Sequence, residues 1–297
     1  MQLKSALIAA SFFAFTNAAL AQVPGAVTTD PPVDKAHPAA MDYVRIPSHG
    51  ALLNGVLYTA SGASPHPGVV LLHGFPGNEQ NLDLAQAIRR AGINVLTLHY
   101  RGAWGSQGNF SFTHAAEDSD AAVQFMTSNA AKYATDPARI FVIGHSMGGW
   151  LAASATDHAP NVAGLVMISA WDIGAQGPRF RDPAFRKKQA AGDFGENVIP
   201  LAGTSADALM QEAAANASHW DFVDHAPQIK TRPVLIITAN DGLTPDNLRL
   251  GKALRAAGDG DVSEMHMDTD HPYSDHRIAL ESAIVAWLLK HVEATAH

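Results

Sequence analysis

Short apolar runs separated by turn residues dominate the pattern along this chain. Two early runs, Tyr43–Ile46 and Leu52–Tyr58, flank a turn at residues 48–50 and predict a β-hairpin. Continuous apolar runs of about four to eight residues follow, and this pattern is typical of strands buried on both faces. They are Gly68–Leu72, Ile93–Leu98, Ile140–Ile143, Val162–Ile168, Val234–Thr238 and a weaker one at Ser263–Met267.

Helical patterns lie between these runs and complete an alternation of strands and helices. They cover Asn78–Ala91, His114–Lys132, Gly149–His158, Asn247–Ala257 and His276–His291. Such alternation predicts an α/β fold, in which right-handed crossovers wind a mostly parallel central sheet with helices on both faces. We expect one domain over residues 41–297. It is preceded by a Pro-rich segment, residues 22–40, that is typical of a mobile leader.

One stretch, residues 172–230, breaks the alternation because it contains no clear strand. The strands before and after it both end at the sheet edge where open α/β sheets bind ligands. We therefore predict a lid-like insertion that lines the substrate pocket, with a poorly packed structural appendage as the alternative. Its apolar and aromatic residues are Phe180, Phe185, Phe194, Leu201, Leu209, Met210, Trp220 and Phe222.

The first residues have the layout of a secretory signal peptide. A charge at Lys4 precedes the apolar run Ala6–Phe15 and the small residues Ala19–Ala21. We predict a signal peptide over residues 1–21, cleavage after residue 21, and export to the periplasm or the medium. The alternative is a retained membrane anchor, but Thr16 and Asn17 interrupt the apolar run, which is short for a span of about 20 residues.

The composition excludes several classes of protein. The chain has 297 residues, of which 47% are hydrophobic and 16% charged, and this mixture favours a globular core over disorder. There is no cysteine, so no disulfide, thiolate metal site or lipidated cysteine can form. The formal charge of −8 argues against a nucleic-acid partner.

A G-x-S-x-G motif occupies residues 144–148, with the sequence Gly-His-Ser-Met-Gly. It follows a predicted strand and precedes a predicted helix, as a nucleophile elbow requires. The serine of such an elbow lies on a strained turn, where the flanking positions have no room for a Cβ atom. Ser146 is therefore the candidate nucleophile. The alternative is a glycine-rich helix start that contains a serine by chance.

The segment His73-Gly74-Phe75-Pro76-Gly77 directly follows the run Gly68–Leu72. Here the chain resembles the α/β-hydrolases, whose HG-x loop donates one oxyanion-hole N–H. The resemblance implies an α/β-hydrolase fold in which the backbone N–H groups of Phe75 and Met147 hold the oxyanion. We interpret the His73 side chain as structural, because the required donor is a backbone amide.

The candidate acid is Asp241, which follows the run Val234–Thr238 at the ligand edge of the sheet. A triad acid orients the imidazole and stabilises its charged form. An Asx-type turn at Asn240-Asp241-Gly242 would use the same residues and is the alternative interpretation. Asp172, at the end of the preceding strand, is the rival acid.

Two histidines near the C-terminus compete for the role of general base. His271 directly follows the last predicted strand, and residues 270–274, Asp-His-Pro-Tyr-Ser, resemble the Asp-His-x-Phe-Ser segment of dienelactone-hydrolase-like and prolyl-oligopeptidase-like relatives. Pro272 departs from a simple loop match because it restricts His271 to extended backbone. His276 is the rival and is expected to cap or pack the last helix.

The loop Tyr100–Gly108 is also similar to that of the same relatives, and the resemblance spans residues 66–292. Within and after this loop, Trp104, Phe110 and Phe112 fit either a pocket wall or the core, and the core is favoured for the two phenylalanines.

The chain has 15 histidines, and His266, Asp268, Asp270, His271 and His276 lie close together in the sequence. We interpret this cluster as coincidence, since no H-E-x-x-H or comparable helical pair occurs and a serine triad needs no metal. No cofactor is expected.

Ester hydrolysis through an acyl-enzyme on Ser146 is the expected function, with a small-molecule ester as substrate. One alternative is peptide hydrolysis of the prolyl-oligopeptidase type, but the roughly 45 residues between Ala21 and His66 are too few for the large gating domain usual in those enzymes. Perhydrolysis with the same triad is a second alternative. A non-catalytic binding protein on the same scaffold is a third.

Overall fold

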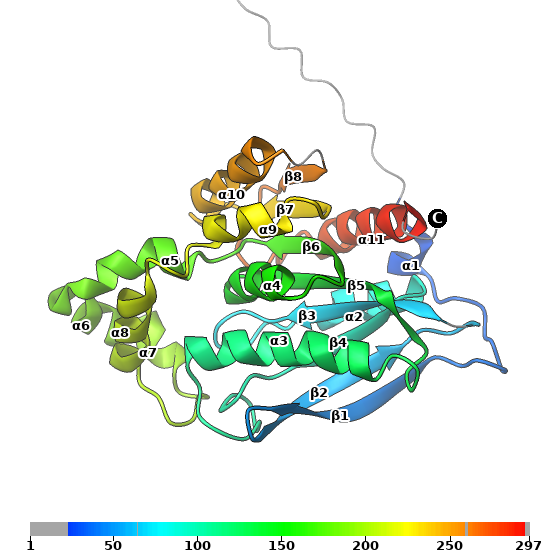
Figure 1. Ribbon diagram of the computed structural model, residues 1–297, viewed down its shortest axis with the longest axis horizontal. Coiled ribbons are helices and arrows are strands. Elements are labelled where there is room, and N and C mark those ends of the chain that lie inside the picture. The colour runs from blue at the N-terminus through cyan, green and yellow to red at the C-terminus, as the bar shows by residue number, and fades with distance from the viewer. Residues whose placement is uncertain (1–22, 64, 259–260, 295–297) are drawn as a thin grey trace, which may run out of the picture.

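A computed structural model describes residues 23–63, 65–258 and 261–294. An eight-stranded sheet runs through the molecule in the order β1-β2-β4-β3-β5-β6-β7-β8 (Figure 1). The first two strands are antiparallel, and β2 also pairs antiparallel with β4, while the other neighbours are parallel. The predicted signal peptide, residues 1–21, lies outside the described residues.

The strands follow the predicted apolar runs closely. The predicted hairpin is formed by β1 and β2, and the weak last run is an edge strand, β8, that is partly exposed. The bounds are β1 Ala40–Ser48, β2 Ala51–Thr59, β3 His66–Leu72, β4 Asn94–Leu98, β5 Thr135–His145, β6 Val162–Ile168, β7 Val234–Thr238 and β8 Val262–His266.

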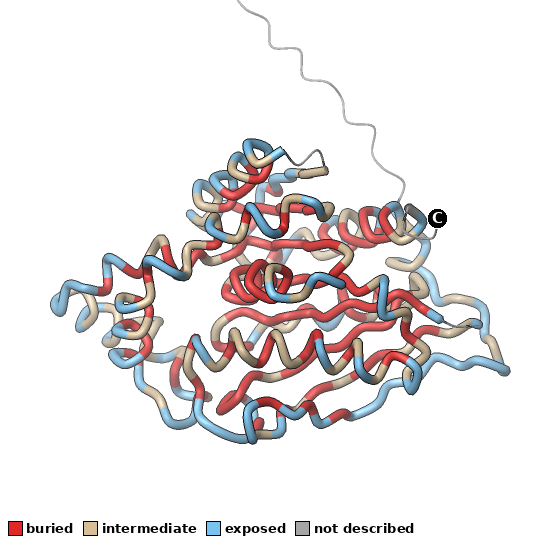
Figure 2. The backbone as a smooth tube through the Cα atoms, viewed as in Figure 1, coloured by how far each residue is buried: buried red, intermediate tan, exposed pale blue. Residues whose placement is uncertain are grey.

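Helices cover both faces of the sheet, and the strands contribute alternate residues to two separate cores. In β3, Val70 and Leu72 belong to one hydrophobic cluster, whereas Val69 and Leu71 belong to the other. Each face of the strand packs against helices, which explains the uninterrupted apolar runs. Figure 2 shows that the central strands are buried along most of their length. One face carries α3 Phe112–Ser128, α4 Met147–His158 and α10 Thr244–Ala256; the other carries α2 Leu82–Arg90 and α11 Arg277–Ala294.

Segment 172–230 folds into short helices, of which α5 to α8 lie at one end of the sheet while α9 lies beside α10 (Figure 1). They are α5 Ile173–Gln176, η1 Gly177–Arg181, α6 Pro183–Ala190, α7 Asp193–Asn197, α8 Ala206–Asn216, η2 Phe222–His225 and α9 Ala226–Ile229. The segment leaves from the carboxyl end of β6 and reaches the loop after β4, where Leu201 forms a bridge with Ala103. Its first part therefore lies at the carboxyl ends of the central strands, whereas α9 packs on one face of the sheet and leads to the start of β7.

Part of the segment expected to be a mobile leader packs against the domain. It contains a short helix, α1 Gly25–Thr28, and Arg90 donates hydrogen bonds to the carbonyls of Ala26 and Val27. Ala26 and Val27 also pack against the second core. Among the described residues, no helix is long and apolar enough to span a membrane.

Candidate active site

Ser146 lies on a strained turn between β5 and α4, as the motif predicts. Its backbone is left-handed, with φ 57° and ψ −122°, a conformation that residues with a Cβ rarely adopt. A Cβ at Gly144 would lie 1.8 Å from the Gly148 carbonyl oxygen, and one at Gly148 would lie 2.2 Å from the Leu72 carbonyl oxygen. Both glycines are therefore required by the close passage of the backbone.

The backbone at the end of β6 fixes this turn. The Ser146 N–H donates to the Ile168 carbonyl at 2.9 Å, and the Trp171 N–H donates to the Ser146 carbonyl at 2.9 Å. The Ser146 side chain is partly exposed, at the N-terminus of α4. The hydroxyl is thus held at the edge of the sheet where segment 172–230 emerges.

His271 and Asp241, which lie 30 residues apart in the chain, are in direct contact. His271 Nδ1 lies 2.8 Å from Asp241 Oδ2. The Asp241 side chain is only 5% exposed and the His271 side chain is 37% exposed, so the imidazole connects a buried acid to the surface of the site. A buried carboxylate in contact with an imidazole nitrogen can orient the ring and stabilise its charged form.

Hydrogen bonds keep the Asp241 carboxylate ionised despite its burial. Burial raises its pKa, but hydrogen bonds from His271, the Leu243 N–H and Ser169 outweigh that effect and lower the pKa to about 2. The Leu243 N–H donates to Oδ1 at 2.9 Å, so the expected Asx-type turn is also present. The Asp241 side chain therefore forms the turn through Oδ1 and contacts His271 through Oδ2.

His145, the residue that precedes Ser146 in the motif, contacts both the backbone and the ring of His271. Its Nε2 lies 2.9 Å from the His271 carbonyl oxygen, and the two imidazole rings are 4.7 Å apart. Burial lowers the pKa of His145 to about 3, so the ring is neutral and Nε2 donates. His145 and Ser169 both lie at carboxyl ends of strands, but no sequence motif predicts a role for either residue.

The His73–Gly77 loop passes directly beside the nucleophile. A Cβ at Gly74 would lie 2.9 Å from the Ser146 Cβ and 3.4 Å from its Oγ. The backbone N–H that follows Gly74 belongs to Phe75. Met147 is the first residue of α4, so the Met147 N–H has no hydrogen-bond partner within the helix. Both predicted oxyanion donors thus belong to backbone that adjoins Ser146.

Side chains from the loop after β4 hold this backbone in place. Tyr100 donates its hydroxyl proton to the His73 carbonyl at 2.9 Å, and Trp104 Nε1 donates to the Pro76 carbonyl at 2.8 Å. His73 Nδ1 lies 2.7 Å from the Gly74 carbonyl oxygen. Burial lowers the pKa of His73 to about 3, and the neutral ring donates to the peptide unit that carries the Phe75 N–H.

The rival acid and the rival base have other partners. Asp172 caps α5 through the Ala175 N–H and forms an ion pair of 2.7 Å with Arg249. Burial raises the pKa of Asp172 to about 7. His276 lies just before α11 and pairs with Asp275.

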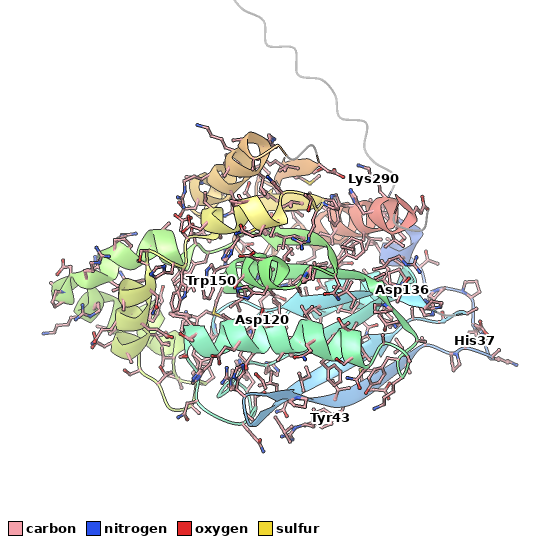
Figure 3. The ribbon with its side chains drawn as sticks, in the orientation of Figure 1. His37, Tyr43, Asp120, Asp136, Trp150 and Lys290 are labelled. Atoms are coloured by element: carbon pink, nitrogen blue, oxygen red, sulfur yellow. The ribbon has the colours of Figure 1, made fainter. Side chains whose placement is uncertain are left out.

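Several aromatic rings surround Phe75 beneath segment 172–230. Phe194 of α7 stacks on Phe75 at 5.1 Å, and Trp171 lies 6.4 Å from the Phe75 ring. Phe110 and Phe112 are buried, as expected of core residues, whereas Trp104 is 42% exposed. Trp150 of α4, labelled in Figure 3, packs against Trp220 of the segment at 5.1 Å.

The clustered histidines and carboxylates near the C-terminus contact different partners. His266 contacts Thr238 and Asn240, while His271 and His276 contact Asp241 and Asp275 respectively. Within residues 23–63, 65–258 and 261–294, no group of three or more His, Cys, Asp or Glu side chains could hold a metal ion.

Comparison with known families agrees with this geometry. The model of the alpha/beta hydrolase family matches residues 69–283. This chain belongs to that family. Two curated relatives, uncharacterized protein Rv2307c of Mycobacterium tuberculosis strain H37Rv and MT2364 of strain CDC 1551, are each 30% identical over 143 residues. Those residues are 46% of this chain and 50% of each relative, so the chain spans about half the length of the curated relatives it matches.

Solved structures share the fold of this family member over most of their length. EstE1, a thermostable carboxylesterase from a metagenomic library, superimposes with a TM-score of 0.64 and 20% identity over 86% of this chain and 90% of its own. An esterase of Pyrobaculum calidifontis superimposes with a TM-score of 0.65 and 23% identity, over 85% of this chain and 86% of the esterase. Carboxyl esterase 2 of Tuber melanosporum superimposes with a TM-score of 0.65 and 16% identity, over 87% of this chain and 89% of the esterase.

Proposed function

We propose that this alpha/beta hydrolase is a serine esterase that cleaves carboxylic esters, with Ser146 as nucleophile, His271 as general base and Asp241 as orienting acid. The observation that carries the proposal is the 2.8 Å contact between His271 and the buried Asp241 carboxylate, next to the strained turn of Ser146. The carboxylesterases among the structural neighbours favour esters over peptides. A closer kinship with dienelactone-hydrolase-like enzymes is part of the same proposal.

The proposed mechanism assigns one chemical role to each of these residues. His271 accepts the proton of the Ser146 hydroxyl while Oγ attacks the acyl carbonyl, and Asp241 stabilises the imidazolium. The backbone N–H groups of Phe75 and Met147 donate to the resulting oxyanion. The intermediate collapses, the C–O bond to the alcohol breaks, and His271 returns its proton to the departing alkoxide.

Water then completes the cycle. His271 removes a proton from a water molecule, whose oxygen attacks the acyl-enzyme, and the second intermediate releases the carboxylic acid as Oγ regains its proton. No redox partner or cofactor enters either half-reaction.

A panel of p-nitrophenyl esters beside aminoacyl anilides tests this function. We expect ester turnover that Ser146→Ala abolishes, because the nucleophile contributes nearly all of the chemical step. A preparation that cleaves the anilides more efficiently than the esters would instead support the peptidase alternative. The same chain is proposed to act after export to the periplasm or the medium.

A further inference from the structure

Arg277, the first residue of α11, joins two loops at the edge of the sheet where the site lies. Its Nη1 donates to the carbonyl of Pro272, the residue after His271, at 2.9 Å. Nε and Nη2 donate to the two carboxylate oxygens of Asp83 at 2.7 and 2.6 Å, and Nη2 also donates to Asn81 Oδ1 at 3.0 Å. One guanidinium therefore connects the loop of the proposed base with the start of α2.

The start of α2 ends the loop that carries a predicted oxyanion donor. Residues 73–81 form the loop between β3 and α2, and Phe75 lies within it. Asn81, its last residue, is buried and has a left-handed backbone with φ 54°. Asparagine before a helix usually accepts a hydrogen bond from the helix's own N–H groups, but the Asn81 side chain does not cap α2. Its oxygen accepts from Arg277 instead, so a residue of α11 holds the end of the oxyanion loop.

Backbone carbonyl groups anchor the loop that carries His271. The next residue, Pro272, has no N–H, so at that position the backbone can only accept a hydrogen bond. His145 Nε2 donates to the His271 carbonyl at 2.9 Å, and Arg277 donates to the Pro272 carbonyl at 2.9 Å. The first contact ties the loop to β5, and the second ties it to α2. Arg277 therefore links the imidazole to the oxyanion loop.

The charge of Arg277 does not benefit α11 itself. The residue lies at the N-terminus of the helix, where the helix dipole disfavours a cation. Burial lowers the pKa of Arg277, but the hydrogen bonds and charge of Asp83 outweigh burial and raise it, so the guanidinium stays charged. The Arg277 side chain is only 20% exposed. The contacts with the two loops, rather than the helix, therefore make use of this cation.

We propose that Arg277 is a positioning residue of the Ser146 site. It sets the distance between the imidazole of His271 and the backbone N–H of Phe75. This distance matters because the base and the oxyanion donor act on the same tetrahedral intermediate, and a misplacement of about 1 Å can cost about 100-fold in rate. The inference rests on the proposed function, since it concerns the base and the oxyanion loop of the same site.

The test compares Arg277→Gln with a matched control, Arg232→Gln. Arg232 also donates to backbone carbonyls, but it lies near the amino ends of β6 and β7, at the opposite edge of the sheet from Ser146. In Arg277→Gln we expect kcat for a p-nitrophenyl ester to fall about 10-fold while KM stays within about twofold. Arg232→Gln loses a comparable set of hydrogen bonds, so Tm should fall to a similar extent while kcat stays within about twofold.

Rescue by added guanidinium separates positioning from loss of packing. In Arg277→Ala, a free guanidinium ion can bind the Asp83 carboxylate with the same planar geometry, so kcat should recover several-fold. Arg232→Ala should gain nothing from the ion. In Arg277→Lys one ammonium cannot reproduce the fork, so kcat should lie between those of Arg277→Gln and wild type. Arg277→Lys keeps the charge and carries the test if the other variants fail to fold.

Hydrogen–deuterium exchange tests the inference without turnover. In Arg277→Gln, peptides covering residues 73–86 and 268–276 should exchange faster, whereas a peptide covering residues 226–234 should not change; Arg232→Gln should show the reverse. An unchanged kcat in Arg277→Gln, an equal loss of kcat in Arg232→Gln, or unchanged exchange in both loops would overturn the proposal. A wild-type protein that hydrolyses no ester, with both loops responding to Arg277→Gln, would overturn the proposed function alone.

Discussion

Asp241 and Asp172 show how two carboxylates at neighbouring strand ends acquire different roles. Both are buried, and burial raises the pKa of each. For Asp241 the hydrogen bonds from His271, Leu243 and Ser169 prevail, and the carboxylate is ionised at every pH near neutrality. Asp172 instead caps α5 and pairs with Arg249. The contact of Asp241 with His271 is the reason that we propose Asp241 as the acid.

The first prediction concerns this choice at the residue scale. Asp241→Asn should lower kcat roughly 10⁴-fold, since the amide favours the wrong tautomer of His271. Asp172→Asn keeps a side-chain oxygen to cap α5, so kcat should stay within about threefold of wild type. Steady-state kinetics on one p-nitrophenyl ester checks both variants. A greater loss with Asp172→Asn would transfer the role of acid to that residue.

The sequence predicts individual site residues better than it predicts their partners. Motif context singles out Ser146, and chain order favours Asp241 and His271, the pair that the structure brings into contact. His145 and Ser169 receive no such signal, because their contacts depend on how β5 and β6 align in the sheet. Register between strands is a property of the folded sheet that local pattern does not specify.

At the element scale, the elbow depends on the close approach of α4 to β3. A methyl group at Gly148 would meet the Leu72 carbonyl oxygen at 2.2 Å, and backbone cannot yield as a flexible side chain can. Gly148→Ala should therefore cost about 3 kcal/mol or more. Such a loss corresponds to a fall in Tm of about 6–12 °C for a domain of this size.

Gly25→Ala is the matched control for this prediction. A Cβ at Gly25 has no heavy atom within 4 Å, so Tm should be nearly unchanged. Thermal unfolding followed by circular dichroism measures both variants. Equal Tm values for Gly148→Ala and wild type would show that the elbow has room for a side chain and that its geometry is misunderstood.

Segment 172–230 gives a prediction about specificity. Phe194 stacks on Phe75 beside the predicted oxyanion loop, so Phe194→Ala should enlarge the space next to Ser146. The ratio of kcat/KM between long and short acyl esters should then change by about 10–200-fold, the range for methylene-sized pocket contacts. Ile199→Ala, an exposed position in the same segment, is the control. A uniform change for all acyl lengths would mean that the segment has only a structural role.

The helices of that segment illustrate what local pattern leaves open. All the strands of the sheet follow apolar runs, whereas residues 172–230 fold into short helices whose ends depend on contacts with the rest of the domain, such as the bridge between Leu201 and Ala103. Short helices draw most of their stability from tertiary packing rather than from propensity. The segment 22–40 likewise contains a short helix, α1, at the position where Arg90 donates hydrogen bonds to backbone carbonyls.

At the scale of the whole molecule, export is the expectation with the clearest test. Expression of the full chain in a bacterial host should yield a periplasmic or secreted protein whose intact mass corresponds to a start at Gln22. Processing removes only residues that lie outside the described structure. A protein that retains its first 21 residues and stays with the membrane fraction would support the anchor alternative.

The central claim is that this alpha/beta hydrolase forms a covalent acyl-enzyme on Ser146. Reaction with a fluorophosphonate, followed by peptide mapping with mass spectrometry, tests it most directly. We expect one equivalent of label on Ser146, loss of ester hydrolysis in step with labelling, and no labelling of Ser146→Ala. Label on another residue, or full ester hydrolysis by the Ser146→Ala protein, would contradict the account.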